Sequence, residues 1–233
     1  MQSAWEKIKV DDGSMGLYVS LPEGPGPFPA MVVLQHREGV DEFVQEMTRR
    51  LAREGYVAVA PELYHRDGPD CRDDGATRAK RIQDANIIKD VNSSLTYLKG
   101  HPSVQPGGVG ILGFCQGGRG SYLMAGVSPS FKAAVVYYGG NTFTARGEGP
   151  SPFDRTKEIH CPIMGHFGEE DENPSPEDVR RLDAELTKYN KAHQFHSYPG
   201  AGHAFMNFSA SSYCAQADQT SWPRTLEFIT QHL

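Results

Sequence analysis

The chain lacks the features that mark several classes of protein. No apolar run approaches the roughly 20 residues of a transmembrane helix, and the opening residues, MQSAWEKIKV, do not show the basic-then-apolar order of a secretory signal. Lysines and arginines are scattered, and the net charge of −6 offers no basic surface for nucleic acid or an anionic membrane. We therefore expect a soluble protein that binds neither nucleic acid nor membrane.

Cysteine is scarce and dispersed. No CxxC pair occurs, so neither a zinc knuckle nor a disulfide framework is indicated, and a reduced, cytoplasmic setting fits best. A monomer and a small homo-oligomer are both compatible with the sequence, and no cofactor is predicted. The four cysteines are Cys71, Cys115, Cys161 and Cys214.

Short apolar runs alternate with segments of helical periodicity along the whole chain, without internal repeats. This alternation predicts one α/β domain over residues 1–233, with a doubly wound, mostly parallel sheet. An antiparallel hairpin is predicted at the edge of the sheet. Its two strands are Trp5–Val10 and Leu17–Leu21, and its turn contains Asp11-Asp12-Gly13. The other expected strands are Ala30–Gln35, Tyr56–Pro61, Val109–Phe114, Ala133–Tyr138, Ile163–Gly168 and Gln194–Tyr198. The expected helices are Val40–Glu54, Ala76–Lys99, Gly117–Ala125, Ser175–Tyr189 and Gln219–His232.

The strongest local motif is GFCQGG at 113–118, which follows an apolar strand and opens a helix. It is the nucleophile-elbow pattern of α/β-hydrolases with cysteine in place of serine. Glycines two residues to either side of Cys115 allow the sharp turn, and the positive end of the helix favours a thiolate. A buried structural cysteine is the alternative. The elbow context favours Cys115 as a nucleophile.

A catalytic thiol needs a base, and the α/β-hydrolase order along the chain is nucleophile, acid, histidine. His203 lies in the flexible GAGHAF segment after the last strand and obeys this order. The acid should follow the strand Ile163–Gly168, in the run 169–172, where any one carboxylate taken alone is more typical of a solvated loop. Its place after the strand favours Asp171.

In this order, GFCQGG, GEEDENP and GAGHAF resemble the motifs of the dienelactone hydrolases, or carboxymethylenebutenolidases. These are thiol-based α/β-hydrolases that open lactones formed during aromatic-ring breakdown. The resemblance extends from about the second strand to the last helix. It implies the α/β-hydrolase fold, with Cys115, Asp171 and His203 as nucleophile, acid and base. It also implies an oxyanion hole formed by the backbone N–H groups of Gln116 and Arg37.

Two positions depart from the family pattern. A glutamate that contacts the nucleophile in family members aligns with His36, which we place next to the site, either in a role at the sulfur or as a structural histidine. The arginine that follows the catalytic histidine is absent, which favours a more neutral substrate. Arg81, or Arg78, is the candidate for a remaining cation.

Apolar side chains are expected to line the substrate cleft, although each is individually more typical of a protein core. The candidates for this lining are Tyr138, Phe205 and Met206.

The sequence therefore predicts a cysteine-dependent hydrolase of small lactones or esters that works through an acyl-enzyme. The alternative is a non-catalytic binding or regulatory protein on a hydrolase scaffold, which the histidine at position 36 motivates. A metal site built from His36, Cys115 and His203 lacks any supporting ligand spacing.

Overall fold

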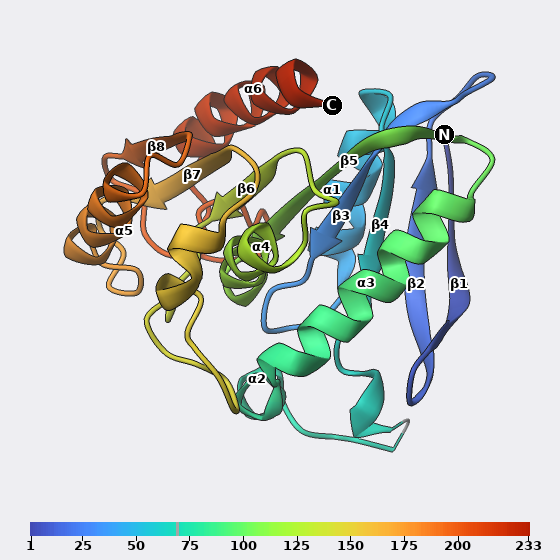
Figure 1. Ribbon diagram of the computed structural model, residues 1–233, viewed down its shortest axis with the longest axis horizontal. Helices are drawn as coiled ribbons and strands as arrows, with labels where there is room; N and C mark the ends of the chain where they lie inside the picture. Colours follow the sequence, from blue (N-terminus) through green and yellow to red (C-terminus); the bar gives the residue numbers. More distant parts are fainter. Residues whose placement is uncertain (69) are drawn as a thin grey trace.

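In the computed structural model, which describes residues 1–68 and 70–233, one eight-stranded sheet runs through the molecule (Figure 1). The strand order is β1-β2-β4-β3-β5-β6-β7-β8. The first two strands form an antiparallel hairpin whose inner strand pairs antiparallel with β4, and the remaining neighbours are parallel. The strands are β1 (Gln2–Val10), β2 (Gly13–Leu21), β3 (Phe28–Leu34), β4 (Val57–Pro61), β5 (Val104–Phe114), β6 (Ala134–Tyr137), β7 (Ile163–Gly168) and β8 (His193–Tyr198).

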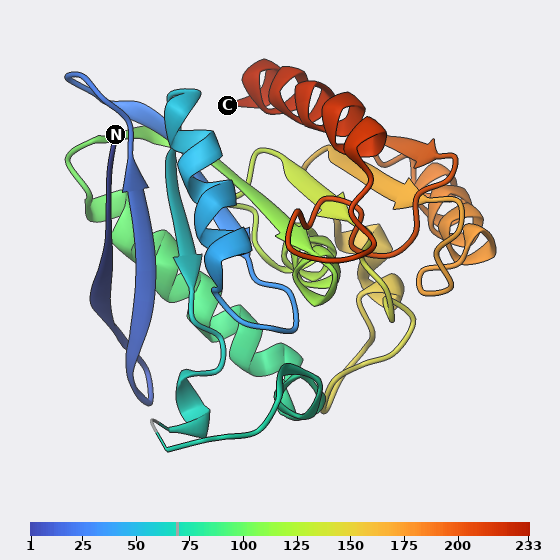
Figure 2. The ribbon, with the colours of Figure 1, turned by 180° about the vertical axis from the view of Figure 1, so that it is seen from behind.

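Helices cover both faces of the sheet, as a doubly wound fold requires. Two helices pack on one face, seen in front in Figure 2, and three pack on the other. The first pair is α1 (Glu42–Arg53) and α6 (Ala215–His232), and the second group is α3 (Asp84–Gly100), α4 (Gln116–Val127) and α5 (Pro176–Lys188). None of the described helices is both long and apolar enough to cross a membrane. The predicted fold class, with its antiparallel edge hairpin, is confirmed.

The predicted helix over 76–99 is wrong in one respect. The chain forms two helices, α2 (Gly75–Arg81) and α3, separated by Ile82 and Gln83, whose ψ angles of 134° and 140° are those of extended backbone. No glycine or proline marks this break. Asp84, the first residue of α3, instead pairs with a buried arginine, Arg119, and this contact turns the chain.

Other boundaries also differ from the sequence-based prediction. The final helix begins at Ala215 rather than Gln219, and three strands begin earlier than predicted: β1 at Gln2, β2 at Gly13 and β5 at Val104. Residues 65–67 and 153–158 form short 3₁₀ helices that were not predicted: η1 (His65–Asp67) and η2 (Phe153–Glu158).

The strand order reverses between β3 and β5, because β4 lies on one side of β3 while the chain continues outward from β5 on the other. Open α/β sheets bind ligands at such a switch point, at the carboxyl ends of the strands. Two segments reach this edge together: the loop after β3 and the turn between β5 and α4. The fold therefore places residues 35–38 beside Cys115.

Candidate active site

Cys115 occupies a strained turn between β5 and α4. Its φ of 56° and ψ of −118° lie where side chains are rarely found, a strain typical of functional positions. The flanking glycines make the turn possible: a Cβ on Gly113 would lie 2.1 Å from the carbonyl oxygen of Gly117. A Cβ on Gly117 would lie 2.3 Å from the carbonyl oxygen of Leu34 in β3. Because Gly113 and Gly117 have no Cβ, backbone segments approach each other closely at both positions, and the resulting turn presents the thiol at the edge of the sheet.

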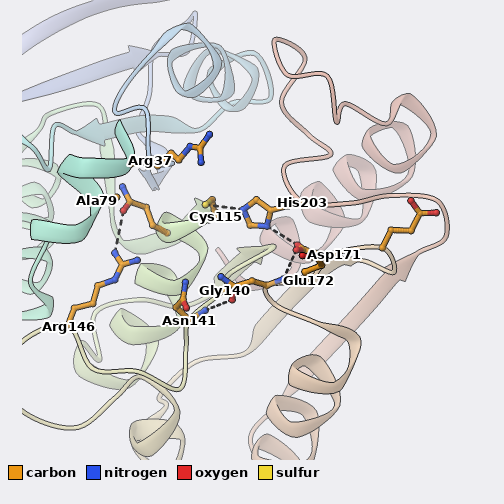
Figure 3. A pocket seen from close by; sticks show the side chains of 13 residues that line it. Arg37, Ala79, Cys115, Gly140, Asn141, Arg146, Asp171, Glu172 and His203 are labelled. Atoms are coloured by element: carbon orange, nitrogen blue, oxygen red, sulfur yellow. Dashed lines mark hydrogen bonds and ion pairs between the residues drawn. The ribbon is translucent and has the colours of Figure 1, made fainter. Parts of the chain in front are cut away.

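The thiol, an imidazole and a carboxylate form one chain of contacts (Figure 3). Nε2 of His203 lies 3.0 Å from Sγ of Cys115, and Nδ1 of His203 lies 2.8 Å from Oδ2 of Asp171. The second carboxylate oxygen of Asp171 accepts a hydrogen bond from the backbone N–H of Asn173 at 2.8 Å. Three loops, after β5, β7 and β8, thus bring together residues that are far apart in the sequence.

Burial distinguishes Asp171 from the other acids of its loop. Its side chain is 2% exposed, whereas Glu169, Glu170 and Glu172 are exposed to solvent. A carboxylate that is buried and hydrogen-bonded to an imidazole fixes the tautomer and orientation of the ring. Among these four residues, the geometry suits only Asp171 to that task.

The surroundings of His203 favour its protonated form. Burial alone lowers its pKa, but the hydrogen bonds to Asp171 and Cys115, together with the negative charge of both partners, raise the pKa to about 10. The ring is therefore an imidazolium at neutral pH, and a cation beside sulfur favours the thiolate.

A hydrogen-bonded network holds the loop after β3 against the elbow. Nε2 of Gln116 donates to the carbonyl oxygen of His36 at 3.1 Å and to the hydroxyl of Tyr64 at 2.7 Å. That hydroxyl in turn donates to the carbonyl oxygen of Arg37 at 2.8 Å. The N–H of Gln116 opens α4 and has no acceptor within the helix, since the first four helical N–H groups never do. Because the backbone carbonyl groups of His36 and Arg37 both accept hydrogen bonds, the Arg37 segment is held beside the backbone N–H of Gln116.

His36 does not lie at the sulfur as the alignment suggested. Its side chain turns toward α1, where Nε2 lies 2.9 Å from Oδ2 of Asp41, out of line for a hydrogen bond, and its ring packs on Phe43 at 5.5 Å between centroids. Only its backbone carbonyl contacts the site, through Gln116. Of its two proposed roles, the structural one matches this position.

The cavity at the elbow has a volume of about 560 Å³, within the range of small-molecule sites. Polar and charged side chains from five loops line it. Its lining consists of Arg37, Ala76, Ala79, Cys115, Gln116, Gly140, Asn141, Arg146, Glu170, Asp171, Glu172, Asn173 and His203. No group of three or more His, Cys, Asp or Glu side chains in the described ranges is arranged to hold a metal ion.

Arg81 does not reach this cavity. It is half exposed and pairs with two aspartates outside the site, Asp67 and Asp73. The lining contains two other arginines: Arg37, on the loop after β3, and Arg146, on the loop after β6, which sequence reasoning missed as a cation of the site. The position of Arg146 just beyond the Tyr-Tyr-Gly run at the end of a parallel strand was the available signal, because such loops meet at the ligand-binding edge.

The three apolar candidates lie behind the cavity rather than along it. Phe205 and Met206 are fully buried, and Tyr138 is 1% exposed. The ring of Tyr138 meets that of His203 edge to face, with 5.2 Å between centroids, and packs similarly on Phe205. These residues form the core layer that supports the imidazole, and none of the three is among the residues that line the cavity.

Comparison with known proteins gives consistent matches over nearly the whole chain. A family model described as "Dienelactone hydrolase family" matches residues 15–233. A protein of Synechocystis sp. named "Putative carboxymethylenebutenolidase" is 32% identical over 225 residues, which cover 93% of this chain and 91% of that protein. A Bradyrhizobium sp. protein named "Probable 2-oxo-3-(5-oxofuran-2-ylidene)propanoate lactonase" is 28% identical over 238 residues, covering 98% and 94%. The crystal structure titled "Putative Dienelactone Hydrolase", from Klebsiella pneumoniae, superposes with a TM-score of 0.91 at 30% identity and covers 99% of both chains.

Proposed function

The chain belongs to the dienelactone hydrolase family of lactone and ester hydrolases, and we propose that it hydrolyses small lactones or esters with Cys115 as the nucleophile. One observation carries this proposal: Sγ of Cys115, the imidazole of His203 and the carboxylate of Asp171 are joined by contacts of 3.0 and 2.8 Å at the wall of one cavity. A binding module has no need of that arrangement.

In the first half of the proposed reaction, the thiolate of Cys115 attacks the carbonyl carbon and forms a C–S bond. The carbonyl π electrons move to oxygen, and the backbone N–H groups of Gln116 and Arg37 stabilise the oxyanion. When the tetrahedral intermediate collapses, the C–O bond to the leaving group breaks and His203 donates its proton to the departing oxygen. The product of this half is a thioester on Cys115, and His203 is neutral.

In the second half, neutral His203 removes a proton from water, and the hydroxide attacks the thioester carbon. The same two N–H groups hold the second oxyanion, the C–S bond breaks, and the acid product leaves. Asp171 remains ionised throughout and keeps Nδ1 of the imidazole protonated and aimed correctly. The thiolate and imidazolium are regenerated, so the cycle consumes only substrate and water.

The test is hydrolysis of a panel consisting of a carboxylated dienelactone, neutral lactones and short p-nitrophenyl esters. Wild type is compared with Cys115→Ala, and Cys214→Ala serves as a matched control because that cysteine is also half-buried but does not line the cavity. We expect Cys115→Ala to lower kcat/KM about 10³-fold or more, as loss of a triad nucleophile does, and Cys214→Ala to leave it unchanged.

An acyl-enzyme is tested directly by intact-protein mass spectrometry at short reaction times. Slowing deacylation with His203→Ala should let a mass increment equal to the acyl group accumulate on the peptide that contains Cys115. Turnover that survives in Cys115→Ala, or acylation of another residue, would refute the assignment of the nucleophile.

A further inference from the structure

The guanidinium of Arg146 lines the cavity without a carboxylate partner among the described residues. Its one side-chain hydrogen bond runs from Nη1 to Oε1 of Gln116 at 3.3 Å. Burial and the neighbouring charge of Arg119 lower the pKa of Arg146, and the negative charge of Asp84, which is paired with Arg119, offsets only part of this effect. The other arginine of the lining, Arg37, already pairs with Glu38 at 2.8 Å. A half-buried cation without a counter-ion in a ligand cavity is a site for an anion.

A second, fully buried arginine holds the segment that carries Arg146. Arg119 is 0% exposed, forms a two-pronged pair with the carboxylate of Asp84, and donates to the carbonyl oxygens of Asn141 and Thr144. Asp84 also accepts the backbone N–H of Arg146 at 3.0 Å, and its own N–H donates to the carbonyl oxygen of Arg146 at 2.8 Å. The loop is therefore pinned from both sides, so Arg146 faces the cavity from a fixed backbone.

The position of Arg146 specifies which part of a substrate it would meet. In Figure 3, Arg146 and His203 lie on opposite sides of Cys115. Since His203 protonates the departing oxygen, the leaving group must lie on its side. In Figure 3 the exposed residue Glu172 also lies on that side, and its carboxylate repels an anion. A group that reaches Arg146 therefore belongs to the acyl portion.

Resting on the proposed hydrolase function, we propose that Arg146 forms an anion subsite that selects substrates with a carboxylate on the acyl portion. Half-esters of dicarboxylic acids, and lactones with a carboxylate on the acyl side of the ring, are the matching chemical class. The absence of an arginine after His203 thus does not make the site neutral, because the cation comes from the loop after β6 instead. Arg119 and Asp84 are positioning residues for this subsite.

Two matched pairs of esters separate the acyl side from the leaving-group side. The first pair is p-nitrophenyl adipate, with a free carboxylate, and p-nitrophenyl adipamate, its neutral amide. The second pair is p-carboxyphenyl hexanoate and p-carbamoylphenyl hexanoate. We expect wild type to prefer the anionic member of the first pair by about tenfold in kcat/KM, as expected for a charge-assisted hydrogen bond, and to show no such preference in the second pair.

The variants locate the cation by the ratio within the first pair, which is independent of changes in overall turnover. Arg146→Gln should reduce the ratio to about one, and Arg146→Lys should keep part of it. Arg37→Gln should keep the ratio, as should Arg180→Gln, which removes one exposed positive charge outside the cavity. A wild-type ratio near one, an unchanged ratio in Arg146→Gln, or loss of the ratio in Arg37→Gln would overturn the proposal.

A binding measurement tests the subsite without turnover. Calorimetric titration of adipate into Cys115→Ala should give a Kd that rises about tenfold when Arg146→Gln is added. An equal Kd in the two proteins would refute the subsite, even if Cys115 proves to be the nucleophile. Conversely, turnover in Cys115→Ala together with weakened adipate binding in the Arg146→Gln background would refute the proposed mechanism and leave the subsite standing.

Discussion

Replacing Asp84 by alanine should destabilise the protein by about 3–5 kcal/mol, the cost of breaking a buried ion pair by removing one partner. The structure explains the size of the effect. Arg119 is completely shielded from solvent, so its charge would remain buried without compensation. Two of its N–H groups and the backbone N–H of Arg146 would lose their acceptors, and each unsatisfied buried donor costs about 1–3 kcal/mol.

Urea unfolding at neutral pH, followed by circular dichroism, measures this loss as a fall of roughly 1–2 M in the transition midpoint. Asp84→Asn keeps one acceptor oxygen and should lie between wild type and Asp84→Ala. The double variant Asp84→Leu with Arg119→Met removes both charges and should recover much of the stability, because apolar replacements of a buried pair are often neutral.

A loss below about 1 kcal/mol in Asp84→Ala, which is the range of exposed ion pairs, would show that the contact is not the anchor described here. A double variant no more stable than Asp84→Ala would show that shape, and not unpaired charge, dominates at this position.

Four further predictions concern the site. The imidazolium of His203 next to Sγ of Cys115 predicts that iodoacetamide alkylates Cys115 faster near neutral pH in wild type than in His203→Gln. An equal rate in the two proteins would contradict the ion pair. Because the pKa of His203 is raised, protonated His203 contributes stability that is fully present below about pH 6.5 and is lost as the pH rises through about 10, which urea midpoints at several pH values would detect. Gly117→Ala should cost about 1–3 kcal/mol and abolish hydrolysis, since its Cβ would lie 2.3 Å from a backbone oxygen of β3, whereas Gly100→Ala, with nothing within 4 Å, should do neither. Tyr64→Phe should lower kcat roughly tenfold with little change in KM, because its hydroxyl holds the loop that carries the proposed oxyanion N–H of Arg37; an unchanged kcat would mean that the loop is held by other contacts.

The sequence alone was sufficient for the architecture and for the order of the motifs. Apolar strands that alternate with amphipathic helices can be buried only in a doubly wound sheet, and the glycines around Cys115 are required by the elbow whatever surrounds it. These features can be predicted from the sequence because each depends on backbone geometry within a few residues.

Tertiary structure decided what depends on orientation and burial. Four acidic residues follow β7, and only the folded loop shows that Asp171 is the one buried against an imidazole. His36 lies in the loop after β3, which the fold places beside the elbow, yet its side chain turns to Asp41 at the start of α1. Side-chain direction after a strand ends is set by the packing of the next element, which periodicity does not encode.

The cation of the cavity illustrates the same limit most clearly. Arg81 and Arg146 both follow strands in the sequence, but salt bridges on the surface hold the first, while Asp84 and Arg119 hold the backbone of the second. Asp84 lies 35 residues from Arg119 in the sequence, and no local pattern couples them. The residue types were therefore readable from the sequence, whereas the choice among them came from long-range contacts that form only when the chain is folded.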